Sequence, residues 1–443
     1  MIAIVESRAD RASVNVCDRL RELVDWERRE DPDRPAADGG GSYLVTDGFE
    51  LRSFETVHVE LERPAAAFDA DPDLLVFASR HSGETGPLLS AHATGNFGAA
   101  ELGGEPRSLA RAAPNALSTL LEAFDEHAPP GYDVGLECTH HGPTDVGVPS
   151  LFAELGSGDA QWDDPDGAEA VARSILALRG TPPHRERQLV GFGGNHYAPR
   201  FTRIARETPW AVGHVAADWA LESMGHPGSP ENRAVLEAAF ERSRASLAVV
   251  ADDRPVLEEV LADLGRRVVG ETWLRVVGDR PLELVAAVEG ALGAIDDGVR
   301  FGAIEVPADE LVVVELPEAL LAEVRAIDPD RAWSAVAARS VAFGTENGAS
   351  RIGGRVALAD AGDRGAIVAS FADLLAEKYE AVRTEGDAIV AEETAFDPEL
   401  AREAGVPEGP AFGRLADGEA VTVGGRRVEP ADVHVRKIHR FPV

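Results

Sequence analysis

The amino-acid sequence predicts an α/β protein with a mostly parallel sheet sandwiched by helices, followed by a second, smaller α+β domain. Two observations lead to this prediction. Short β-branched runs alternate with helical patterns through residues 1–225, a spacing typical of strand–helix–strand units. At 443 residues the chain also exceeds the size that a single hydrophobic core usually reaches. We therefore expect two domains, residues 1–280 and 281–443.

Apolar runs of strand length mark the first domain, and the run from Leu74 to Ala78 is apolar enough to be buried on both faces. Amphipathic patterns of helical period lie between these runs. The expected strands are residues 2–5, 74–78, 133–136, 188–192, 247–251 and 268–270, and the expected helices are residues 11–23, 117–126, 167–178, 234–243 and 255–264. In the second domain, helical patterns at 282–292, 318–326 and 371–382 alternate with short apolar runs at 311–315 and 388–391.

The charge balance is strongly acidic. The chain has 77 Asp and Glu residues against 43 Lys and Arg, a net charge of −34, and its only lysines are Lys378 and Lys437. An acidic surface nearly without lysine suits concentrated salt, where carboxylates keep the protein solvated and their mutual repulsion is screened. We therefore expect a protein of an extremely halophilic organism. The acidity does not exclude a nucleic-acid substrate, because arginines and backbone donors act at short range.

The sequence predicts neither a targeting segment nor a membrane span. It has no uninterrupted apolar run of about 18 residues. The first residues, Met1 to Glu6, read as a strand and not as a signal peptide. Cys17 and Cys138 are the only cysteines, too few for a disulfide framework. These features predict a cytoplasmic protein.

Histidine is concentrated in one part of the chain, where eight of the twelve lie between His81 and His214. Six of the eight occur in polar strings that lie beside glycine turns, at residues 79–82, 92–98, 137–143, 193–197 and 213–214. Four of the strings come after predicted strands, and α/β sheets bind ligands at the carboxyl ends of their strands. Histidine titrates near neutrality, binds metals and transfers protons. The strings therefore predict a reaction centre.

The string from Glu137 to Pro143 is the most informative. His140 and His141 are adjacent, so in an extended segment they would point to opposite sides and take different roles. Glu137 and Glu154 supply carboxylates that can orient a histidine, accept a proton or bind a metal. Because no His-Glu-x-x-His or Cys-x-x-Cys spacing is present, a zinc site would need ligands from several loops. A structural histidine pair at a turn is the alternative interpretation.

The string Gly193-Gly194-Asn195-His196-Tyr197 also follows a predicted strand. Its glycine pair allows backbone N–H groups to face a ligand, and the oxyanion of an acyl-transfer reaction needs such donors. Neither the P-loop nor the dinucleotide-binding spacing is present. The alternative interpretation is a flexible turn with a hydrogen-bonded histidine.

Five motifs in order resemble those of the archaeal and plant type of D-aminoacyl-tRNA deacylase. They are Ser-Arg-His (79–81), His-x-x-Gly-Asn (92–96), Glu-x-Thr-His-His-Gly-Pro (137–143), Val-Pro-Ser-x-Phe-x-Glu-x-Gly-Ser (148–157) and Gly-Gly-x-His-Tyr-x-Pro (193–199). The resemblance covers about residues 1–280. It implies hydrolysis of the ester bond of D-aminoacyl-tRNA, which releases a free D-amino acid and tRNA in translation quality control. It also implies zinc use and a core sheet like that of peptidyl-tRNA hydrolases and phosphorylase-type folds.

The strings and the resemblance together single out the site residues. The expected catalytic residues are His81, His92, Glu137, His140, His141 and His196, with His140 or His141 preferred for activating water. The expected substrate-binding residues are Arg80, Asn96, Thr139, Gly193, Gly194 and Tyr197. The expected zinc ligands are His140, Glu154 and His196, and the number of ions stays open.

The expected partner is D-aminoacyl-tRNA. The protein is expected to be a monomer and to bind neither a membrane nor DNA. Residues 281–443 extend beyond the usual length of the family, and the sequence assigns them no role. Two other functions stay open. A zinc-dependent amidase or peptidase on a related scaffold would cleave peptides and leave aminoacyl-tRNA intact. A non-catalytic tRNA-binding protein would bind tRNA without turnover.

Overall fold

Two β-sheets frame the first of the two units into which the chain divides, Met1–Gly278 and Asp279–Val443. The structure is a computed structural model that describes residues 1–443. The larger sheet of the first unit has eight strands in the order β2-β3-β4-β1-β5-β10-β6-β9. These strands are β1 (Ile2–Ser7), β2 (Glu27–Asp31), β3 (Gly41–Thr46), β4 (Phe49–Phe54), β5 (Leu74–Arg80), β6 (Leu88–His92), β9 (Asp133–Leu136) and β10 (Ser150–Gly156).

The larger sheet is mixed, with four parallel and three antiparallel strand pairs, so the prediction of a mostly parallel sheet holds for it only in part. β1 is parallel to both of its neighbours, β4 and β5, whereas β2, β3 and β4 pair in antiparallel fashion. The link between β3 and β4 is residues 47–48 alone, and so short a link permits only an antiparallel pair. β10 is parallel to β5 on one side and antiparallel to β6 on the other.

The smaller sheet of the first unit is fully parallel, in the order β12-β11-β13-β14. It follows the strand–helix alternation that the sequence predicts. Its strands are β11 (Gln188–Phe192), β12 (Ala211–Ala216), β13 (Leu247–Val250) and β14 (Arg267–Val268). The accompanying helices are α5 (Pro199–Glu207), α6 (Asp218–Met224), α7 (Pro230–Ser243), α8 (Pro255–Asp263) and α9 (Glu271–Val277), and a short pair, β7 (Gly95–Asn96) and β8 (Ser108–Leu109), lies outside both sheets.

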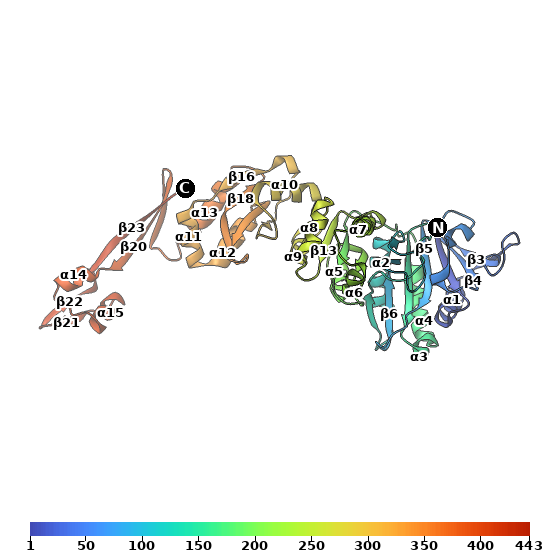
Figure 1. Ribbon diagram of the computed structural model, residues 1–443. Helices are drawn as coiled ribbons and strands as arrows, with labels where there is room; N and C mark the ends of the chain where they lie inside the picture. The colour runs from blue at the N-terminus through green and yellow to red at the C-terminus, as the bar shows by residue number, and fades with distance from the viewer. The chain divides into compact units, whose positions relative to one another are not determined.

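Helices cover one face of the larger sheet. α4 (Pro165–Ala177) packs against both α1 (Arg11–Leu23) and α2 (Pro114–His127), with α3 (Asp159–Trp162) beside them (Figure 1). α1 begins after Asp10, whose carboxylate accepts hydrogen bonds from N–H groups of the first turn.

Irregular segments cover the opposite face, so the expected sandwich of helices is incomplete. There Phe77 and Phe152 belong to an apolar cluster that includes residues of the short 3-10 helix η2 (Pro64–Ala67). Another 3-10 turn, η1 (His58–Glu60), lies a few residues before it. This stretch is interrupted by proline and lacks the length of apolar helical pattern that an α-helix needs.

The strand order brings together residues that are far apart in the sequence. Because β10 lies between β5 and β6, Glu154 pairs with Ser79 on one side and Ser90 on the other. His92, at the end of β6, is opposite Phe152. β9 ends immediately before Glu137. Both carboxylates therefore lie close to the strand ends that carry the histidine strings.

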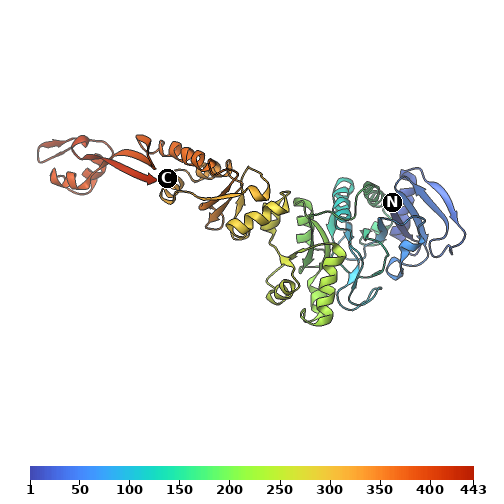
Figure 2. The ribbon, with the colours of Figure 1, turned by 90° about the horizontal axis from the view of Figure 1, so that it is seen from above.

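The second unit is built from small antiparallel sheets with helices packed beside them. One sheet has the order β15-β17-β18-β16 and another the order β19-β20-β23; β20 and β23 form a long ribbon that leads to the β21–β22 pair (Figures 1 and 2). The strands are β15 (Arg300–Phe301), β16 (Val312–Glu315), β17 (Ala342–Glu346), β18 (Arg351–Leu358), β19 (Ala381–Glu385), β20 (Ala388–Phe396), β21 (Val421–Val423), β22 (Arg426–Val428) and β23 (His434–Pro442). The helices are α10 (Leu282–Leu292), α11 (Glu318–Ile327), α12 (Pro329–Ala337), α13 (Asp363–Leu375), α14 (Pro398–Glu403) and α15 (Pro410–Ala416), with 3-10 turns η3 (Ala308–Glu310) and η4 (Pro430–Asp432). No helix of the chain has both the length and the apolar character needed to span a membrane.

Candidate active site

Histidines from separate strings meet at one cavity of the first unit. His81, His140, His141 and His196 line a cavity of about 510 Å³. His92 lies beside them, with its ring centroid 4.3 Å from that of His140 and 4.9 Å from that of His141. The rings of His140 and His196 are 4.6 Å apart. The structure thus places all five of the histidines expected to be catalytic in one cluster.

Glu137 connects three of these rings. Its side chain is 0% exposed, and its Oε1 lies 3.0 Å from Nδ1 of His81. Its Oε2 lies 2.7 Å from Nε2 of His196, in a hydrogen bond, and 3.8 Å from Nε2 of His140. Burial would raise the pKa of Glu137, but the contacts with His196 and His81 outweigh it and hold the pKa well below its usual range. Glu137 is therefore a buried anion at the centre of the cluster.

Glu154, in the middle of β10, is a second buried carboxylate. Its Oε1 lies 3.5 Å from Nε2 of His92, and its Oε2 lies 3.6 Å from Nδ1 of His81. Burial opposes ionisation, yet the neighbouring His81 and His92 lower the pKa of Glu154. The oxygens of Glu154 make longer contacts than those of Glu137. The neighbouring histidines therefore hold the oxygens of Glu154 less tightly than those of Glu137, and Glu154 lines the cavity.

The histidines fall into two electrostatic classes. Burial lowers the pKa of His81, but contacts with Glu137 and Glu154 raise it to about 9. Burial likewise opposes the cation of His196, but contacts with Cys138 and Glu137 raise its pKa to about 10. Burial and the proximity of His92 lower the pKa of His141 to about 4 and that of His140 well below its usual value. The first pair favours the cation, and the second pair favours the neutral ring.

His92, His140 and His141 are arranged like metal ligands. In each ring Nδ1 lies at hydrogen-bond distance from a backbone carbonyl, at 3.2, 2.9 and 2.7 Å respectively. Nε2 of His92 is buried without a hydrogen-bond partner. The potential ligand atoms of the three residues all lie within 4.8 Å of one another. When a histidine binds a metal, its other ring nitrogen is commonly held by a hydrogen bond of this kind.

Two further groups of residues have potential ligand atoms equally close together. One is Cys138, His140 and His196, and the other is His81, Glu137 and Glu154.

The prediction that His140 and His141 point to opposite sides is wrong. Their ring centroids are 4.3 Å apart, and both rings line the same cavity. The reason is the backbone: His141 has φ of 45°, in the left-handed region, so the segment is not extended there. Residues held in this sparsely populated region are often found at functional sites.

Comparison with known proteins decides the family. The D-aminoacyl-tRNA deacylase family model matches residues 68–269. A D-aminoacyl-tRNA deacylase of Halorubrum lacusprofundi is 53% identical over 481 aligned residues, which cover 100% of this chain and 97% of that protein. The chain belongs to the D-aminoacyl-tRNA deacylase family. The family and the enzyme class predicted from the motifs are therefore confirmed.

Other relatives of the deacylase family extend the similarity to both units. A D-aminoacyl-tRNA deacylase of Natronomonas pharaonis is 54% identical over 100% of both chains. One of Methanoregula boonei is 33% identical over 98% of this chain and 96% of its own. Residues 281–443 are therefore a part shared with these relatives and not an addition peculiar to this chain. The halophilic archaeal relatives also agree with the source that the acidic composition predicts.

A solved structure supports the α/β fold of the deacylase. The crystal structure of a conserved protein of unknown function, AF0625, superposes with a TM-score of 0.56 at 27% sequence identity. The match covers 62% of this chain and 96% of that one.

Two of the residues predicted to bind the deacylase substrate lie at the cluster. Arg80 lines the histidine cavity, and its guanidinium lies 5.3 Å above the ring of Trp162. The ring of Tyr197 lies 5.1 Å from that of His196 and 5.7 Å from that of His81.

Four other predicted substrate-binding residues have their polar groups occupied by the protein itself. The Asn96 amide donates to backbone carbonyls of its own loop, and the Thr139 hydroxyl lies 3.0 Å from Nδ1 of His214. The N–H of Gly193 donates to a backbone carbonyl at 2.8 Å, and that of Gly194 donates to Asp218 Oδ1 at 2.7 Å. These two N–H groups are therefore not free to stabilise an oxyanion, and the structure does not support that prediction.

The cavity also includes a histidine that the sequence analysis missed. His58 is buried, with its ring 5.7 Å from that of Phe77 and 5.8 Å from that of Phe152. Its Nδ1 lies 3.7 Å from Oδ2 of Asp10. His58 lies between two valines and has no polar string around it, so its sequence surroundings carry no signal of a site.

Proposed function

We propose that the histidine cluster is where the chain hydrolyses the ester bond of D-aminoacyl-tRNA, releasing a free D-amino acid and tRNA. The observation that carries this proposal is the juxtaposition of the three clustered rings of His92, His140 and His141 with two buried carboxylates, beside one cavity. An activated ester needs an activated water, a group that stabilises the developing oxyanion and a proton for the leaving oxygen. The cluster contains candidates for the first and the last.

We propose zinc as the cofactor, held by His92, His140 and His141. The three rings fit it because each fixes Nδ1 to a carbonyl and leaves Nε2 available. When bound, zinc acts as a Lewis acid on the ester carbonyl and lowers the pKa of water to about 7. This ligand set shares His140 with the set predicted from the sequence. It replaces Glu154 and His196 by His92 and His141.

We assign proton transfer to the two remaining predicted ligands. Glu154 accepts a proton from the attacking water, because its oxygens make only long contacts and it lines the cavity. His196 donates a proton to the 3′ oxygen of tRNA as the C–O bond breaks. Its side chain is 31% exposed, so it can reach a substrate, and Glu137 orients its ring through the 2.7 Å hydrogen bond. His81, between the two carboxylates, holds both in place.

We also propose that the first domain, residues 1–280, carries the reaction, since every residue of the cluster lies within it. A site built from one chain is consistent with the expected monomer. We also propose a relationship to the peptidyl-tRNA hydrolase and phosphorylase type of core, supported by the parallel run β4-β1-β5-β10 with helices packed on one face. A tRNA substrate supports a cytoplasmic enzyme.

The test is alanine substitution of His92, His140 and His141, one at a time, in molar KCl. We expect each variant to lose bound zinc by metal analysis and to lose D-Tyr-tRNA hydrolysis at least 100-fold. His127→Ala, at the end of α2 and away from the cluster, is the matched control and should behave like the wild type. Full zinc content and turnover in all three variants would contradict the proposal.

A further inference from the structure

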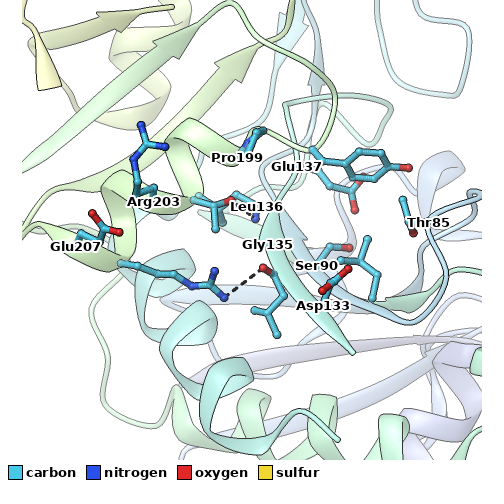
Figure 3. Close-up of a pocket in the computed structure, with 14 residues that line it drawn as sticks. Thr85, Ser90, Asp133, Gly135, Leu136, Glu137, Pro199, Arg203 and Glu207 are labelled. Atoms are coloured by element: carbon cyan, nitrogen blue, oxygen red, sulfur yellow. Dashed lines mark hydrogen bonds between the residues drawn. The ribbon is translucent and has the colours of Figure 1, made fainter. Parts of the chain in front are cut away.

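A second cavity, of about 480 Å³, adjoins the histidine cluster. Glu137 and Tyr197, which contact the clustered histidines, also line this cavity. Figure 3 shows Glu137 near one end of it and Arg203 and Glu207 near the other. The rest of its wall comes mainly from β6, β9 and α5.

We propose that this second cavity holds the side chain of the D-amino acid while its ester is hydrolysed at the cluster. The inference rests on the proposed function, because it takes the cluster as the place of reaction. At one end of the cavity Glu137 and Tyr197 contact His196 and His81, and its other end, at Arg203 and Glu207, lies away from the cluster. The side chain of an aminoacyl group whose ester lies beside His196 would therefore be close to this cavity.

The wall of the cavity suits an amino-acid side chain. Leu88, Leu136 and Pro199 give it apolar surface. Ser90, opposite Glu154 in the sheet, adds a hydroxyl that is fully buried and has no hydrogen-bond partner. A buried polar group without a partner costs free energy, so a ligand that bonds to it gains affinity. Ligand pockets typically combine apolar walls with a few such polar groups.

The charged end of the cavity does not suit a nucleotide. A phosphate needs a cation that is free to meet it, but both arginines there are engaged. Arg203 makes hydrogen bonds of 3.0 and 2.8 Å to Glu271, and Arg206 makes one of 2.7 Å to Asp125. Arg80, in contrast, lines the histidine cavity, makes no ion pair and stacks on an indole ring. The tRNA end of the substrate therefore fits the histidine cavity, and the amino-acid end fits the second cavity.

Gly135 in β9 provides the test, because it lines the second cavity and has room for a side chain. A Cβ atom built there would meet only the Thr202 hydroxyl, at an ordinary contact distance of 3.5 Å. Gly135→Leu would fill part of the cavity, and Gly135→Ala would fill much less of it. kcat/KM is measured for D-Tyr-tRNA and D-Ala-tRNA with the full chain in molar KCl.

We expect the ratio of kcat/KM for D-Tyr-tRNA over D-Ala-tRNA to fall at least tenfold in Gly135→Leu and by less in Gly135→Ala. Single methylene groups in apolar pockets already change such ratios by about 10–200-fold. Gly290→Leu is the matched control, since a Cβ at Gly290 in α10 meets nothing within 4 Å. It should keep the wild-type ratio.

An unchanged ratio in Gly135→Leu would overturn the inference, whether both substrates react normally or both slow equally, as they would if the terminal adenosine occupied the cavity. If circular dichroism shows that Gly135→Leu does not fold, Gly135→Val is read in the same way. Failure of the proposed function is a separate result: turnover would then survive substitution of the histidine triad, whatever the ratio.

Discussion

Replacing Glu137 by Gln tests the centre of the histidine cluster directly. The carboxylate contacts His196 at 2.7 Å and His81 at 3.0 Å, and its side chain is fully buried. Hydrogen bonds to charged groups contribute about 1.5–3 kcal/mol each. A glutamine keeps one acceptor oxygen and loses the charge. We therefore expect the free energy of unfolding to fall by about 2–4 kcal/mol.

The effect on catalysis should be larger than the effect on stability. Without the anion, His196 loses its orientation and its preference for the cation, so proton donation to the leaving oxygen is impaired. We expect kcat for D-Tyr-tRNA hydrolysis to fall about 10²–10⁴-fold, the usual contribution of a positioned acid or base. Single-turnover deacylation in molar KCl, with urea unfolding of the same samples, measures both quantities.

Glu6→Gln is the matched control for this experiment. Glu6 is also buried, with its side chain 4% exposed, and forms a 2.6 Å ion pair with Arg21, away from the cluster. The control should lose comparable stability and keep its kcat. A Glu137→Gln enzyme whose kcat stays within about twofold of the wild type would refute the role assigned to the carboxylate.

Three other predictions concern the packing around the site. His214 is fully buried and burial lowers its pKa to about 4, so the unfolded state binds more protons below its ordinary pKa of about 6.5. The free energy of unfolding should therefore fall by about 2 kcal/mol between pH 7.5 and pH 5 through this group, and His214→Gln should show a smaller fall in urea titrations at the two pH values. Arg52 is 0% exposed and makes ion pairs of 2.6–2.7 Å with three carboxylates; Arg52→Met should cost about 3–5 kcal/mol, seen as a lower denaturant midpoint, and an unchanged midpoint would contradict this. A Cβ at Gly156 would lie 2.6 Å from Cβ of His81, so Gly156→Ala should displace the His81 ring. The substitution should lower the free energy of unfolding by about 1–3 kcal/mol, measured by thermal unfolding, and should lower kcat. Wild-type stability together with wild-type kcat would show that the site relaxes freely.

Part of the candidate active site could be predicted from the sequence, because the sequence pattern shows where strands end. Apolar runs end just before Glu137 and Gly193, and the carboxyl ends of strands are where α/β sheets bind ligands. That reasoning places the histidine strings near one another without knowledge of the sheet order. It also predicts a carboxylate beside His140.

The rest depends on long-range pairing, which the sequence pattern does not contain. The insertion of β10 between β5 and β6 brings Glu154 to the cluster and makes the sheet mixed. The left-handed backbone of His141 turns adjacent rings to one cavity, although the residue is not glycine. His58 reaches the cavity from a 3-10 turn with no motif around it. The N–H groups of Gly193 and Gly194 donate hydrogen bonds to partners more than twenty residues away in the sequence.

The position of β10 makes the chemistry depend on how two strands are aligned. Side chains alternate between the faces of a sheet, so a slip of one residue against β5 and β6 would turn Glu154 away from His81 and His92. Such a chain would retain nearly all of its helices and strands, and its far-ultraviolet spectrum would hardly differ. Turnover therefore reports whether β10 paired in the correct register during folding. A shift of register is a defect that bulk measures of secondary structure do not detect.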